Sequence, residues 1–260
     1  MEITIPITNW KSAILVVGLV VLAFCTHHVI YYYNPKLDET ITALQSDDPA
    51  AIAQALLESS DLDMAKGHKL IPYILPLLSD KRLVTEHAAQ EMTHKIQSSP
   101  GAIPGMGAHL NGIPTVGFSA AMTIQALVIV DTFHTRWIGG KAKERIISYV
   151  TQEIDPDDEY SISNALAAVG HIHSRRLLPF WFQCLAIESE SIRIQALSGL
   201  TYYIYDRTHG LFTWKPEKEI SQSMAGTLKA CLEDPSPYIR QEAEDVIRQL
   251  KTAGFSLRDE

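Results

Sequence analysis

The chain has 260 residues, which is long enough for one sizeable core or two modest ones, and its formal net charge is −8. No stretch gathers lysine and arginine, so the clustered positive charge that neutralises nucleic-acid phosphates is missing, and nucleic acid is excluded as a partner. The three cysteines form no CxxC pair, which excludes the common zinc and redox motifs.

The first element is an apolar stretch at residues 13–33, preceded by a short tail at 1–12. As one helix it would reach roughly 31 Å, close to the hydrocarbon core of a bilayer at about 30 Å. Aromatic side chains, which favour the headgroup layer, stand at both ends. They are Trp10, Tyr31, Tyr32 and Tyr33. The pattern predicts a transmembrane helix that contacts lipid along residues 13–33.

Two other interpretations of this stretch stay open: a cleaved secretory signal ending near Ala23-Phe24-Cys25, and a buried core helix. His27 and His28 near its end are interpreted as neutral residues reaching toward the interface rather than as a haem or proton site. Lys11 before the stretch and acidic residues after it favour a cytoplasmic N-terminus and an exported body, periplasmic or extracytoplasmic. A body facing the cytosol is the alternative.

Residues 34–260 read as helices separated by polar turns, without strands. Apolar positions recur at helical spacing, and Asp48-Pro49 is a typical helix start. The helices are expected at 37–46, 49–59, 64–78, 83–97, 120–132, 141–153, 161–169, 176–187, 191–205, 217–232 and 237–251. Two loops rich in glycine, proline or aromatic residues interrupt them, at 98–117 and 206–216.

A spacing recurs between these helices: a leucine that closes one helix stands 11 residues before an alanine inside the next. The pairs are Leu78 with Ala89, Leu185 with Ala196, and Leu232 with Ala243, and Asp155 with Ala165 is a looser copy. The small alanine lets the second helix approach its neighbour closely. A single helix pair cannot bury both of its apolar faces, so pairs are expected to stack on one another. An arginine early in the second helix and an aspartate in the turn can then bond along the stack.

The stretch LKACLEDPSPYIRQEAEDVIRQL at 228–250 resembles a HEAT repeat, and those at 70–97 and 177–204 are similar. Two positions depart from the pattern, since Glu86 replaces the arginine in one copy and Ile187 replaces the turn aspartate in another. The resemblance implies an all-α fold: a single N-terminal transmembrane helix followed by a HEAT-like α-α superhelical solenoid at 34–260. It also implies protein–protein binding as the usual task, without catalytic residues common to the class.

Cys184 and Cys231 occupy equivalent positions in successive repeats. Stacked helices lie about 8–10 Å apart, whereas a disulfide needs Cα atoms within about 7 Å. Two small core residues are therefore expected, with a disulfide as the alternative.

His171-Ile-His173 is the pattern closest to a metal site, with Asp155, Asp157 and Asp158 nearby in sequence. On a helix, residues i and i+2 point about 200° apart and cannot share a metal, although in an extended turn they could. Two histidines at the C-terminus of a helix are also explained by their favourable interaction with the negative end of the helix dipole. No metal ligand, catalytic residue or cofactor is therefore assigned.

The aromatic residues near the second loop are divided between core and contact positions. Tyr202, Tyr203 and Tyr205 cannot share one helix face, so some belong to the core. The residues expected to bind a partner are His109 in the first loop and Phe212 and Trp214 in the second.

The sequence thus predicts a membrane-tethered protein-binding scaffold, or an accessory subunit of a membrane complex, whose partners are other proteins. It is expected not to be an enzyme. The alternative is a metal-dependent helical-repeat enzyme, a hydrolase, lyase or hydroxylase, that uses His109, His171 or His173.

Overall fold

The computed structural model describes residues 35–59, 68–84, 115–134, 139–208, 216 and 220–255. Within them every regular element is a helix, apart from one antiparallel bridge between Leu83 and Thr115. The expected span at 13–33 lies outside the described residues, and among the described helices none is long and apolar enough to cross a bilayer. The chain divides into two compact units, Met1–Thr42 and Ala43–Glu260. Helix α2 (Pro35–Leu44) begins in the first, and the elements below belong to the second.

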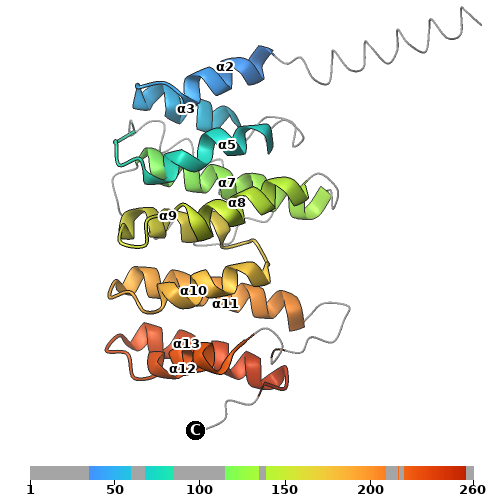
Figure 1. The fold of residues 1–260 in the computed structure, drawn as a ribbon, viewed down its shortest axis with the longest axis vertical. Helices are drawn as coiled ribbons and strands as arrows, with labels where there is room; N and C mark the ends of the chain where they lie inside the picture. Colours follow the sequence, from blue (N-terminus) through green and yellow to red (C-terminus); the bar gives the residue numbers. More distant parts are fainter. Residues whose placement is uncertain are drawn as a thin grey trace, which may run out of the picture. The chain divides into compact units, whose positions relative to one another are not determined.

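Two rows of helices alternate along Ala43–Glu260. The A helices are η1 (His68–Leu70), α5 (Ile71–Ile74) and η2 (Leu75–Ser79) in succession, then α8 (Gly139–Gln152), η3 (Arg175–Leu177) with α10 (Leu178–Cys184), and α12 (Gln222–Cys231). The B helices are α3 (Pro49–Ser59), α7 (Val116–His134), α9 (Glu159–Val169), α11 (Glu190–Thr208) and α13 (Pro237–Thr252). Each A helix packs on the B helix that follows it, and the B helices pack on one another in chain order (Figure 1). The expected all-α stack of helix pairs is confirmed.

Local chemistry sets where several helices begin. Pro49 occupies the first turn of α3, where its missing N–H costs nothing, and the Asp48 carboxylate accepts the Ala50 amide at 2.9 Å. Ser221 caps α12 by accepting the Met224 amide at 3.3 Å. The prediction that Asp48-Pro49 starts a helix is confirmed.

The recurring alanines have the role that their spacing predicted. Ala165, Ala196 and Ala243 lie inside α9, α11 and α13, and none of them has any solvent exposure. A larger side chain there would hold neighbouring helices apart, because interiors are packed to near-crystalline density. The described B row therefore stacks closely through its small residues.

The first turn of the stack differs from the expectation. Leu83, where a helix was expected to begin, instead forms a bridge with Thr115; the rest of that expected helix, residues 85–97 with Ala89, lies outside the described residues, and the described helix that packs on η2 is α7. The chain returns to the same turn, since Val116 donates its amide to the Arg82 carbonyl and Gly117 donates to the Asp80 carbonyl, both at 2.9 Å. The expected loop at 98–117 was therefore two residues too long: these two amides are fixed by the 80–82 turn as α7 begins.

Gly117 is required where α7 meets its neighbours. A Cβ atom there would lie 2.6 Å from the Tyr160 hydroxyl, 2.7 Å from the Asn164 amide nitrogen and 2.7 Å from the Leu78 carbonyl. Those groups already bond, since Asn164 donates to the Leu78 carbonyl at 2.8 Å and Tyr160 donates to the Asp80 carbonyl at 2.8 Å. The missing side chain thus lets α7, α9 and the 78–80 turn meet at one point.

Candidate functional site

Every residue to which the sequence gave a partner-binding or membrane-interface role lies outside the described residues. These are His109, Phe212 and Trp214 for partner binding, and Trp10, Tyr31, Tyr32 and Tyr33 at the membrane interface. His27 and His28 lie outside them as well. The expected roles of these residues stay predictions.

His171 and His173 follow the end of α9, and His171 faces α11. Its ring centroid lies 5.3 Å from that of Tyr202, with the planes tilted by 43°. Burial, and secondarily the charge of His173, lowers the pKa of His171 below its ordinary value, so at neutral pH the ring is an uncharged packing partner. This geometry bridges two neighbouring B helices.

The acidic residues that could have joined these histidines lie at the opposite end of α9. Asp155 and Asp158 precede this helix and His171 follows it, and 11 residues of helix span about 16 Å. Among the described residues no group of three or more His, Cys, Asp or Glu side chains is arranged to hold a metal ion. The described part of the chain therefore does not bring the sequence's metal candidates together.

Cys184 ends α10 and Cys231 ends α12, so they occupy matching places in successive A helices. Both are buried free thiols. Burial raises the pKa of Cys184 to about 12 and also raises the pKa of Cys231. They are core residues, as their repeat positions predicted.

One surface of the described stack stands out because it has no charge. From Tyr160 to Gly170 on α9, and from Ile194 to Tyr205 on α11, no residue is acidic or basic. The partly exposed positions recur at helical spacing, so they form one stripe on each helix. We call this surface the B face and define it by Ser163, Ala167, Gln195, Ser198, Tyr202 and Tyr205.

Direct contacts join the two helices of the B face. The Gln195 amide donates to the Ser163 hydroxyl at 3.0 Å, and the His171–Tyr202 ring contact lies farther along the same helices. Between these contacts the side chains Ala167 and Ser198 are small. Tyr205 is 57% exposed at the end of the stripe. The B face is thus a fixed, uncharged surface with a large aromatic side chain at its rim.

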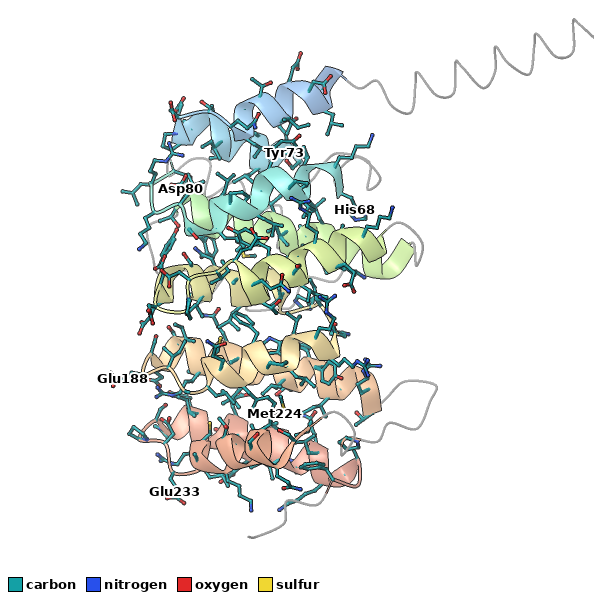
Figure 2. All side chains as sticks on the ribbon, in the orientation of Figure 1. His68, Tyr73, Asp80, Glu188, Met224 and Glu233 are labelled. Atoms are coloured by element: carbon teal, nitrogen blue, oxygen red, sulfur yellow. The ribbon has the colours of Figure 1, made fainter. Side chains whose placement is uncertain are left out.

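Charge returns on either side of the B face. Helix α13 carries Glu242, Glu244, Asp245 and Arg248 on its solvent-reaching positions. The turns between A and B helices are acidic, and Asp80, Glu188 and Glu233 mark three of them along one edge of the stack (Figure 2). A partner on the B face would therefore meet an uncharged centre with charged borders, in which acidic side chains outnumber basic ones.

The sequence analysis missed the B face, although its signal was visible. Twelve consecutive residues from Ile194 to Tyr205 without a charge are unusual for a helix that reaches solvent, and α9 repeats the feature. The three tyrosines were correctly divided: Tyr203 is fully buried, Tyr202 is partly exposed and Tyr205 is exposed. What the sequence did not reveal was that α9 and α11 lie side by side.

Comparison with known proteins gives little. No protein family matches the sequence, and no curated protein matches it. Among solved structures, a designed armadillo repeat protein is similar with a TM-score of 0.39 and 16% sequence identity, over 82% of this chain and 99% of that chain. A TM-score this low carries no argument, and the fold follows from the helix packing described above.

Proposed function

We propose that this chain is a membrane-tethered protein-binding scaffold, an accessory subunit of a membrane complex, which holds a partner protein on its B face. The observation that carries the proposal is the absence of charge from Tyr160 to Val169 on α9 and from Ile194 to Tyr205 on α11. The cores of protein interfaces are depleted of charged residues and enriched in tyrosine, because charges lose hydration there while rigid aromatic rings bury much area. This composition supports a binding role for the B face.

The size of the B face indicates how such binding would work. The uncharged part of α11 is about 17 Å long and two neighbouring helices are about 20 Å wide, which gives roughly 350 Å². A stable interface of standard size uses about 800 Å² on each partner. The B face alone would thus give a modest affinity, and the partner would also have to contact its borders.

Tethering compensates for a modest affinity. The apolar stretch at 13–33, interpreted as a membrane span, would confine the stack to the bilayer surface. A partner in the same membrane would then be present at an effective concentration in the millimolar range, far above its bulk value. We propose further that the body lies on the exported side, as the distribution of Lys11 and the later acidic residues favours.

Placing one charge in the B face tests the proposal. The full chain is expressed at its native level, crosslinked in membranes, solubilised and purified with its partners. Ser198→Arg should reduce the recovered partner at least tenfold, because the interface would have to bury an unmatched guanidinium. The matched control Ser223→Arg alters an exposed serine of α12 and should leave recovery unchanged.

Two results would refute the scaffold. One is recovery of only the uncomplexed chain from native membranes. The other is equal recovery of the partner by Ser198→Arg and Ser223→Arg, with circular dichroism confirming that both variants are folded.

A further inference from the structure

A groove opens between α8 and α10, on the A side of the stack and away from the B face. It has a volume of about 460 Å³ and is partly open to solvent. Its lining is mixed: Val150 from α8, Ile162 from α9, and Phe180 and Cys184 from α10 form an apolar floor, and polar side chains complete the lining, namely Thr151, Gln152, Arg176 and Gln183. Each of the four floor residues is at most 8% exposed.

The groove follows from how the two rows stack. Helices α9 and α11 pack directly on each other, whereas α8 meets the next A segment mainly at η3, near the start of α10. There Arg176 forms an ion pair with Glu144 of α8, which closes this end of the groove. Farther along, the A helices separate and the floor between them is reached from outside.

The other end of the groove is acidic. Ile154, Pro156 and Ile187 line it, and their neighbours in sequence are Glu153, Asp155, Asp157 and Glu188. These four carboxylates are exposed, and in the described part of the chain none forms an ion pair with a basic side chain. The one basic side chain in the lining, Arg176, already contacts Glu144 at the far end. The floor therefore leads to a rim with four unpaired carboxylates, where the Arg193 guanidinium is held on the Ile187 and Glu188 carbonyls and leaves the local charge negative.

We infer that this groove, which we call the A groove, docks a short segment of a partner protein that carries bulky apolar side chains followed by lysine or arginine. The apolar side chains would cover the floor formed by Val150, Ile162 and Phe180. The basic side chains would lie among the carboxylates at the acidic end. Charge complementarity would thus decide which end of the groove the basic part of the segment occupies. This inference rests on the proposed scaffold function and adds a second contact on the opposite side of the stack.

The groove limits the length of the segment. Helices η3 and α10, which form one wall of the groove, together rise about 16 Å from Arg175 to Cys184. That length accommodates about three turns of a helix, or about five residues of extended chain. An apolar anchor of two or three side chains is thus as much as the floor can take before the basic residues reach the rim.

Three fluorescein-labelled ten-residue peptides serve as probes for this site. The first has two leucines and a phenylalanine followed by three lysines, the second replaces the lysines with glutamates, and the third replaces the apolar residues with serines. They are titrated by fluorescence anisotropy against the full chain in lipid nanodiscs, with empty nanodiscs subtracted. We expect the apolar–basic peptide to bind at least tenfold more tightly than either of the others.

Matched variants locate the binding. Gln183→Trp places an indole in the groove from an exposed lining position and should weaken binding at least tenfold, whereas Gln241→Trp alters an exposed glutamine of α13 and should not. Neutralising the rim with Glu153→Gln and Glu188→Gln should weaken binding of the basic peptide several-fold. The weak binding of the other two peptides should not fall further. The control pair Asp38→Asn and Glu39→Gln removes the same charge from exposed positions of α2.

The possible failures are distinguishable. If no peptide binds, or if all three bind alike, the A groove is not such a site. If binding is lost in Ser198→Arg and kept in Gln183→Trp, the peptide uses the B face, so the groove inference fails while the scaffold function stands. If the groove binds as expected but native membranes yield no partner, the scaffold function fails instead.

Discussion

Arg193 of one helix pair forms an ion pair with Asp234 of the next, with Nε and Oδ2 3.0 Å apart, and its Nη2 donates to Oδ1 at 3.3 Å. Both side chains are largely enclosed, at 12% and 10% exposure. Arg193 also donates to the Ile187 carbonyl at 2.8 Å, so one guanidinium joins its own turn to the following one. Arg240 donates in the same way to the Asp234 carbonyl at 2.6 Å. The contact between arginine and turn aspartate along the stack, expected from the sequence, is confirmed.

Removing Arg193 should weaken the cohesion between the last two helix pairs. Arg193→Ala leaves the Asp234 carboxylate enclosed without its cation, which costs up to about 3–5 kcal/mol when a pair is fully buried. Because this pair retains some exposure, we expect a loss of about 1–3 kcal/mol in the free energy of unfolding, measured by urea denaturation.

A surface ion pair supplies the control for that measurement. Arg248 and Asp245 lie within α13 at 72% and 37% exposure, and exposed pairs contribute about 0–1 kcal/mol. Arg248→Ala should therefore shift the urea midpoint little. Equal shifts for the two arginines would mean that the link between Arg193 and Asp234 does not hold the stack together.

Gly117→Ala tests the close approach at the start of α7. The added methyl group would lie under 3.0 Å from side-chain or backbone atoms of Tyr160, Asn164 and Leu78. Overpacking of this kind typically costs about 1–3 kcal/mol, and we expect a loss of that size in the free energy of unfolding. The measurement is again the urea midpoint.

Gly226 of α12 is the matched glycine, since nothing lies within 4 Å of the position a Cβ atom would take. Gly226→Ala should stabilise the chain by about 0.5–1 kcal/mol through helix propensity. An unchanged midpoint for Gly117→Ala would show that α7 does not approach the 78–80 turn this closely.

Most of the helices could be predicted because their signals are local. Helical spacing of apolar residues, Asp48-Pro49 and the 11-residue interval from Leu185 to Ala196 depend on neighbours in sequence. The same interval from Leu78 to Ala89 stays a prediction, because Ala89 lies outside the described residues. The packing of α7 on η2 depends on the amides of Val116 and Gly117 reaching carbonyls more than 30 residues away, which no local pattern records.

The candidate site was harder to predict than the fold. The sequence prediction chose aromatic residues in loops, Phe212 and Trp214. The B face instead combines small helical residues such as Ser163 and Ser198 with tyrosines at its rim, and no motif marks this combination. Such a surface exists only when two helices separated by about 20 residues of intervening chain lie side by side. It can be recognised by its lack of charge once the stacking order is known.

Cys184 should resist alkylation in the folded chain. Its pKa of about 12 leaves about a thousandfold less thiolate at pH 8.5 than an ordinary thiol of pKa near 9. Peptide mapping after iodoacetamide treatment should find Cys184 unmodified in native buffer and modified in guanidinium chloride. Because the raised pKa lies far above neutrality, the native rate should rise about tenfold per pH unit between pH 8 and 10. Native labelling as fast as in denaturant would place this thiol outside the core.

Deleting residues 13–33 should release the chain from membranes. The full chain is expected to stay in the pellet after an alkaline carbonate wash, because about 20 apolar residues suffice to span the hydrocarbon core. The deletion variant should appear in the supernatant with its helical circular dichroism unchanged. Intact mass measurement distinguishes an uncleaved anchor from a removed signal. Release of the full-length chain by carbonate would contradict the tether.

Photocrosslinking from two tyrosine positions tests the central claim, that a partner occupies the B face. Benzoyl-phenylalanine replaces Tyr205 on α11 or Tyr238 on α13, which are 57% and 68% exposed, so both are accessible to a similar degree. Irradiation of intact membranes should give more adduct between the chain and a second protein from position 205, at the rim of the B face, than from position 238 on the bordering helix. An adduct from position 238 alone, or from neither position, would contradict the account.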